Sequence, residues 1–151
     1  MTKLLSTEQM AEFANSGCLF FEGLIDEDIN KEFLNDIGHT DIDDVDNIQH
    51  YFQNIKSSSS IPRIPAGTAL KDAYPLNSPL EKIFKNEIVS GAINSLVGSK
   101  TVVDHQFLHL TFPSKYYAKA NQRQMSQVNH QDSTIDPRTT FDIQLFYFPT
   151  A

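Results

Sequence analysis

The sequence lacks several features that would place it in a common protein class. Its single cysteine, Cys18, cannot form an intrachain disulfide, so a disulfide-stabilised framework is excluded. It has no stretch of about 18 apolar residues, so no membrane-spanning helix is predicted. Basic residues are few: 12 lysines and arginines against 19 acidic residues give a net charge of −7, which argues against a nucleic-acid-binding face. The residues after Met1 become polar too early for a signal peptide, and we expect a protein of the reducing cytoplasm.

What is present is the composition of one soluble globular domain. Of the 151 residues, 40% are apolar and 21% are charged, which is typical of a folded chain with one sizeable core. We therefore treat residues 1–151 as a single domain. The apolar neighbours of Cys18 predict that its small side chain is buried.

Two short helices are predicted near the start of the chain. Ser6 and Gln9 have the spacing of a capping box, which predicts a helix that stops before Gly17. Asp26 can cap a second helix, in which apolar residues share one face as far as Gly38.

The middle of the chain consists of an irregular polar segment followed by a segment with helical spacing. Residues 39–73 contain an acidic run, four consecutive serines and two prolines, and we expect a lid or a disordered connection there. Helical spacing returns at Ser78, a capping residue followed by Pro79, and continues to Gly98. This segment predicts one long helix.

The remaining apolar segments favour strands. We predict a brief strand over residues 18–21, a long one over residues 101–112, a short one over residues 126–130 and a last one over residues 141–148. Helices followed by strands favour an α+β fold in which helices buttress an antiparallel sheet or barrel. The last strand has no later strand to pair with, so we expect the natural protein to be longer than this chain.

Two His-x-Asp tripeptides could supply metal ligands. His39 and Asp41 lead into the solvated acidic stretch, and we interpret them as surface residues. His130 and Asp132 close a predicted strand, where residues i and i+2 point the same way. Such a pair can hold one ion from one side, and a further histidine would complete the facial triad of non-haem iron enzymes. The alternative is a polar strand end whose side chains hydrogen-bond a neighbouring turn.

Four stretches of sequence carry a resemblance to a known family. They are LSTEQ at residues 5–9, GCLFFEGLI at residues 17–25, SQVNHQDS at residues 126–133 and FDIQLFYFP at residues 141–149. In this order the chain resembles the phytanoyl-CoA dioxygenase family, from about Leu4 to its end. The resemblance implies N-terminal helices packed on a double-stranded β-helix, or jelly roll, that is incomplete because its C-terminal strands are missing.

The resemblance also implies an iron(II)- and 2-oxoglutarate-dependent dioxygenase. Iron(II) would be held by His130 and Asp132, with 2-oxoglutarate and O2 as co-substrates and a small organic molecule as the substrate. The reaction would be hydroxylation, because related halogenases lose the carboxylate that Asp132 retains here. The protein would supply geometry and a dry pocket, and the iron would supply the difficult chemistry.

Five further residues are predicted near this site. In a β-helix, His109 and Thr111 share a strand face that could line the co-substrate pocket, and Gln144 and Phe146 share a face of the last strand. Gln131 points away from the ligand side, but its backbone adjoins the site. For the strand residues, an ordinary hydrogen-bonded strand surface is the alternative.

The implied site is incomplete in this sequence. The family places a second ligand histidine and a 2-oxoglutarate-anchoring arginine well downstream, and no histidine follows Asp132. Arg138 is too close to the turn to replace that arginine, while His105 and His109 lie upstream. We therefore expect weak iron binding and no activity from this chain alone.

Two other interpretations stay open. One is a metal-binding jelly roll of the cupin type, although the His-rich strand motif of cupins is missing. The other is a non-catalytic binding module on the same scaffold, with His130 and Asp132 as relics. The sequence does not identify the substrate or the oligomeric state.

Overall fold

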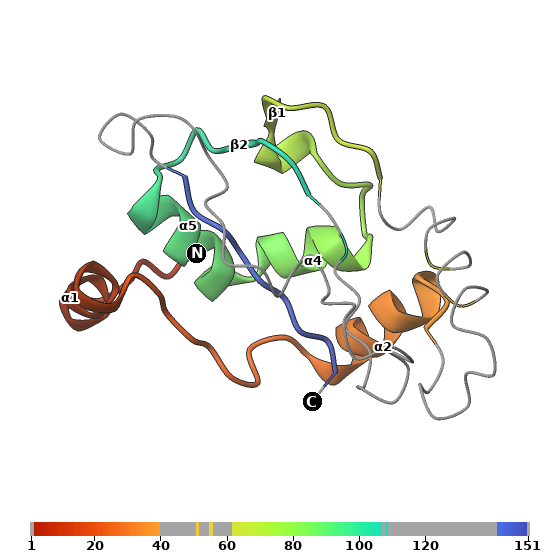
Figure 1. Ribbon diagram of the computed structural model, residues 1–151, viewed down its shortest axis with the longest axis horizontal. Coiled ribbons are helices and arrows are strands. Elements are labelled where there is room, and N and C mark those ends of the chain that lie inside the picture. The colour runs from red at the N-terminus through yellow and green to blue at the C-terminus, as the bar shows by residue number, and fades with distance from the viewer. Residues whose placement is uncertain are drawn as a thin grey trace, which may run out of the picture.

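The fold was analysed in a computed structural model, which describes residues 2–39, 51, 55, 62–106, 108 and 142–150. Helices dominate this part of the chain, and α2, α4 and α5 lie together while α1 stands at one end (Figure 1). In chain order the elements are α1 (Thr7–Ser16), α2 (Glu27–Asp36), β1 (Thr68–Ala69), the 3-10 helix η2 (Leu70–Asp72), α4 (Pro79–Lys85), α5 (Glu87–Leu96) and β2 (Val102–Val103).

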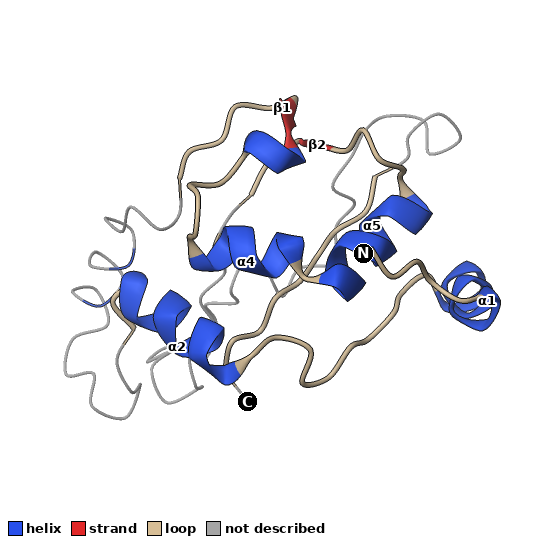
Figure 2. Cartoon of the chain, turned by 180° about the vertical axis from the view of Figure 1, so that it is seen from behind, coloured by secondary structure: helices blue, strands red, loops and turns tan. Residues whose placement is uncertain are grey.

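The predicted α+β fold with a jelly roll is wrong for the described residues. Figure 2 shows helices and loops there, with one small antiparallel sheet in which Thr68 pairs with Val103 and Ala69 with Val102. No described residue of 142–150 belongs to a strand, and neither does any residue of 18–21. The predicted strand over residues 126–130, and residues 109–112 of the long one, lie outside the described residues.

The predicted strand over residues 101–112 is a strand at Val102–Val103, whereas the described residues of the last predicted strand, 142–148, form no β-ladder. In the last segment, Ile143 and Tyr147 are half-buried while Gln144 and Phe146 are exposed, but Leu145, between them on the predicted inward side, is 43% exposed. Tyr147 packs on α2, where its ring meets that of Phe33 edge-on with centroids 5.4 Å apart. The surface of a helix therefore covers an apolar side chain that the sequence pattern predicted to pack in a sheet.

The linker between α1 and α2 is also more exposed to solvent than the sequence predicts. Cys18 is exposed, and Phe20 in the same stretch is 84% exposed. The prediction that Cys18 is buried was therefore wrong. Apolar neighbours in sequence indicate burial only when the segment packs against the core; in this stretch Leu19 is half-buried, and Cys18, Phe20 and Phe21 are exposed.

The core lies where α2, α4 and α5 meet. Phe33 and Ile37 from the α2 region, Ile83 from α4, and Val89 and Ile93 from α5 are all buried. Tyr51 and Ile55 are also buried, so part of the irregular connection after α2 contributes to the core. The other residues of 40–61, where a lid or disorder was predicted, lie outside the described residues.

The first helix forms as its sequence predicts. Ser6 Oγ accepts a hydrogen bond from the Gln9 backbone N–H at 3.2 Å, and Gln9 Oε1 accepts one from the Ser6 N–H at 2.9 Å. Gly17 ends the helix in the left-handed conformation, φ 75°, and its N–H bonds to the Phe13 carbonyl at 2.8 Å. The capping box and the glycine stop are both confirmed.

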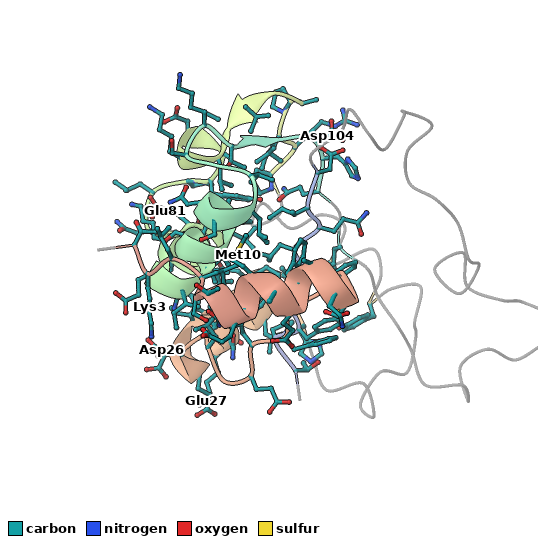
Figure 3. All side chains as sticks on the ribbon, turned by 90° about the vertical axis from the view of Figure 1, so that its left-hand side faces the viewer. Lys3, Met10, Asp26, Glu27, Glu81 and Asp104 are labelled. Carbon is teal, nitrogen blue, oxygen red and sulfur yellow. The ribbon has the colours of Figure 1, made fainter. Side chains whose placement is uncertain are left out.

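The second helix begins after Asp26, as predicted, but without the expected side-chain cap. The Asp26 side chain accepts no hydrogen bond from the first turn of α2, within the part of the chain described. Figure 3 shows Asp26 and Glu27 pointing outward at this end of the helix. Glu27 and Asp28 place negative charge in the first turn, where the helix dipole favours it.

The long helix predicted after Ser78 is two helices. The helix is interrupted at Asn86, whose backbone (φ −52°, ψ 133°) is not helical. Asn86 Oδ1 accepts hydrogen bonds from the Ile88 and Val89 N–H groups at 2.9 and 3.3 Å, so it caps α5. Its Nδ2 donates to the Leu24 carbonyl at 3.3 Å and ties this break to the linker before α2.

An N-terminal arm, residues 2–5, lies along α5. The Lys3 N–H donates to the Glu87 carbonyl at 3.0 Å, and the Leu5 N–H donates to Ser95 Oγ at 3.0 Å. The close approach depends on Gly91, because a Cβ at that position would come within 1.8 Å of the Lys3 carbonyl oxygen. The absence of a side chain at Gly91 thus permits the arm to dock on α5.

A polar clip secures the segment around the small sheet. The Tyr74 ring stacks on Phe84, with centroids 4.9 Å apart, and its hydroxyl donates to Gln106 Oε1 at 2.8 Å. Gln106 Nε2 in turn donates to the Pro62 carbonyl at 2.5 Å. Burial raises the pKa of Tyr74 to about 12.

None of the helices within the described ranges is both long and apolar enough to cross a membrane.

Candidate functional site

Most of the predicted site falls outside the described residues. This holds for the metal ligands His130 and Asp132, for Gln131 between them, and for His109 and Thr111. Their assignments stay predictions. The structure describes the other two candidates, Gln144 and Phe146, together with the segment that carries them.

Gln144 and Phe146 both lie on the outward side of residues 142–150. Gln144 is exposed, and the Phe146 ring is 70% exposed and stacks on Phe148 with centroids 6.5 Å apart and an interplanar angle of 14°. Their proposed role beside the metal stays a prediction, because it depends on the positions of His130 and Asp132, which lie outside the described residues. What is established is that an aromatic pair faces outward from this segment.

Tyr147 anchors the same segment to α2. Its hydroxyl donates to Asn30 Oδ1 at 2.5 Å, and its ring contacts Phe33 edge-on at an interplanar angle of 73°. Burial raises the pKa of Tyr147 to about 12, so this phenol is a neutral donor at physiological pH. This contact joins residues 117 positions apart, so no local pattern in the sequence predicts it.

The first His-x-Asp tripeptide begins at a histidine with a structural contact. His39 Nδ1 lies 2.6 Å from the Tyr51 hydroxyl, and the two rings meet edge-on. Tyr51 is buried, and that burial raises its pKa. His39 is half-buried rather than fully on the surface, and one ring nitrogen is engaged. Asp41 lies outside the described residues.

A second histidine and carboxylate form an exposed pair. His105 Nδ1 lies 2.6 Å from Asp104 Oδ2, directly after β2. Neighbouring positions in a chain readily form such contacts in solvent, where they contribute little to stability. Among the residues described, no group of three or more His, Cys, Asp or Glu side chains gathers closely enough to hold a metal ion.

A shallow hollow lies beside the N-terminal arm. It has a volume of about 190 Å³ and is lined by Thr2, Lys85, Glu87 and Ser90. Pockets for drug-sized ligands usually measure about 300–1,000 Å³ and are mainly apolar. This hollow is smaller and mostly polar, and none of the residues singled out from the sequence lines it.

Comparison with models of known protein families, with curated proteins and with solved structures found no match. The resemblance to the phytanoyl-CoA dioxygenase family therefore rests on the four stretches of sequence alone.

Proposed function

We propose that this chain is part of an iron(II)- and 2-oxoglutarate-dependent dioxygenase that hydroxylates a small organic molecule. The observation that carries the proposal is the tripeptide His130-Gln131-Asp132 within SQVNHQDS, followed by the apolar stretch at residues 141–149. A cytoplasmic setting belongs to the same proposal.

The donor types of this tripeptide fit iron(II). One imidazole nitrogen and one carboxylate oxygen are two of the three ligands of a facial triad. His130 must be neutral to bind a metal, so binding should weaken as the pH falls through the range in which histidine gains a proton. When bound, the iron would supply the oxidative chemistry, and the residues of this chain would hold and orient it.

Two ligands do not complete the site. No histidine follows Asp132 in the sequence, and the arginine that would pair with 2-oxoglutarate has no obvious counterpart. The proposal accordingly includes weak iron binding by residues 1–151 and no turnover by them alone.

One described helix supports the proposal. The capped helix α1 forms where the resemblance expects an opening helix. The segment that follows the tripeptide in sequence is anchored on α2 through Tyr147 and Asn30, rather than in a sheet. The jelly roll is no longer part of the proposal, which now depends on the tripeptide and its sequence context.

The corrected fold favours a second candidate. A binding module without catalysis needs no strand framework around iron, and the described residues form a helical body. In that case His130 and Asp132 would have no joint affinity for a metal.

Anaerobic iron(II) titration by calorimetry separates these candidates. The oxygenase proposal predicts weak binding by the unmodified chain and its loss in both His130→Ala and Asp132→Ala. His105→Ala is the matched control, because it removes an exposed histidine that also lies beside a carboxylate, and it should leave binding unchanged. Unaltered binding in His130→Ala and Asp132→Ala would refute the assignment.

A further inference from the structure

The segment between the N-terminal arm and α2 is weakly packed. Figure 1 shows α1 at one end of the molecule, joined by a long linker to α2. No residue of α1 is buried, and Gln9 and Phe13 are its only half-buried residues. In the linker, Phe20 is 84% and Phe21 38% exposed. This segment therefore gains little stability from the core.

Both ends of the segment are fixed to α5. Before it, the Leu5 N–H donates to Ser95 Oγ at 3.0 Å. After it, the Leu24 carbonyl accepts a hydrogen bond from Nδ2 of Asn86, the capping residue of α5, at 3.3 Å. The stretch in between, residues 6–23, is therefore a loop that starts on one core helix and returns to the same helix.

The hydrogen bonds of residues 6–23 are local. The Met10 N–H donates to the Ser6 carbonyl at 2.9 Å, and the Gly17 N–H donates to the Phe13 carbonyl at 2.8 Å. Within the described chain, no hydrogen bond or ion pair joins this stretch to another part of the protein. Its order thus depends on contacts that it makes with itself.

A helix held in this way is marginally stable. Isolated helices shorter than about 12–15 residues are marginal in water, and helices in proteins are stabilised mainly by packing. α1 has 10 residues, and its stabilising features are the capping box at Ser6 and the left-handed stop at Gly17. The ordered form of α1 is therefore close in free energy to a disordered form.

We propose that residues 6–23 are a flap that orders and disorders as one unit while both of its ends stay fixed on α5. Openings of this kind belong to regions with few buried apolar contacts. Because the ends stay fixed, the disordered flap remains a closed loop and gains less entropy than a free end would. Opening and closing change how Met10 and Phe20 are presented to solvent, and the core of the protein stays folded.

Amide hydrogen exchange in Ala11→Gly tests the flap. Ala11 is exposed in the middle of α1, and glycine at such a position disfavours the helix by about fivefold. The Met10 and Gly17 amides, at opposite ends of the helix, should therefore both exchange about fivefold faster. The Lys3 and Leu5 amides should be unchanged, because the arm stays docked on α5.

Lys31→Gly is the matched control. It places glycine at an exposed position in the middle of α2, and it should leave the exchange of Met10 and Gly17 unchanged. Unequal acceleration of these two amides in Ala11→Gly would show fraying instead of a unit. Acceleration of the Lys3 amide along with them would show that the arm opens too, and equal acceleration in Lys31→Gly would show that only global unfolding exposes them. Each of these results would overturn the proposal.

Heating the unmodified chain gives an independent readout. The Cα chemical shifts of α1 should approach random-coil values well below the midpoint of global unfolding, while those of the buried residues Phe33 and Ile93 stay native. Loss of the α1 shifts only in the global transition would also overturn the proposal.

Discussion

Replacing Gly91 with alanine is expected to displace the N-terminal arm from α5 while leaving the helix itself intact. The added Cβ would lie 1.8 Å from the Lys3 carbonyl oxygen and 2.4 Å from its carbonyl carbon. Ordinary contact begins at 3.4 Å, so the arm must move by well over an ångström. The atoms in the way belong to the backbone, and no change of side-chain rotamer relieves the overlap.

The energetic outcome is a balance of two effects. Displacement of the arm breaks the hydrogen bonds from Lys3 N–H to the Glu87 carbonyl and from Leu5 N–H to Ser95 Oγ. Each contributes about 0.5–1.5 kcal/mol. Alanine in place of glycine inside a helix gains about 0.5–1 kcal/mol. The loss is the larger of the two, and we expect a net destabilisation of about 1 kcal/mol, equivalent to a fall in Tm of about 2–4 °C.

Amide hydrogen exchange followed by NMR resolves this effect by residue. In Gly91→Ala, the Lys3 and Leu5 amides should exchange faster while the amides in the middle of α5 stay protected. Ser95→Ala is the matched control: it removes the acceptor of Leu5 but adds no atom near Lys3, so only the Leu5 amide should lose protection. Retained protection of both amides in Gly91→Ala, with a raised Tm, would refute the close approach.

Three further predictions follow from local contacts. Asn86→Ala should lower the unfolding free energy by about 1–2 kcal/mol, because it removes the cap of α5, whereas Asn86→Asp keeps the cap but loses the donor to the Leu24 carbonyl and should lie between the two in urea unfolding. Ser6→Ala should cost about 1 kcal/mol and reduce helix content chiefly in α1, detected by carbonyl chemical shifts. The pKa values of Tyr74 and Tyr147 are raised to about 12 by burial, so their contribution to stability is complete below the unfolded pKa of about 10 and is lost as the pH rises toward 12. An alkaline series of urea unfolding curves should show this loss, and Tyr147→Phe should reduce it; a flat profile between these pH values would contradict the burial of both phenols.

The parts of the fold that could be predicted are those specified by neighbouring residues. The capping box at Ser6 and the stop at Gly17 depend on hydrogen bonds within a few positions, and both are present. The break at Asn86 was also readable, because asparagine is a strong capping residue. It was missed because apolar spacing continues through it, from Ile83 to Ile88.

The errors arose where long-range packing decides the structure. The sequence alternation over residues 141–148 predicts a strand, but the described residues 142–148 form no ladder and Tyr147 contacts α2. No local pattern distinguishes a strand that pairs from an extended segment that packs on a helix. The hydrogen bond between Tyr147 and Asn30 is likewise a long-range contact that no local pattern predicts. The candidate ligands His130 and Asp132 lie outside the described residues, so the prediction made for them stands on sequence alone.

Joint binding of iron(II) by His130 and Asp132 can be compared with binding at the other His-x-Asp tripeptide, His39 and Asp41, within the same chain. The most direct measurement is anaerobic addition of iron(II) to isotope-labelled protein, followed by paramagnetic broadening of the NMR signals of each residue. If His130 and Asp132 bind iron(II) together, broadening begins at residues 130–132 and reaches His39 and Asp41 only at higher iron concentration. Broadening that begins at residues 39–41, or equally at both tripeptides, would contradict it.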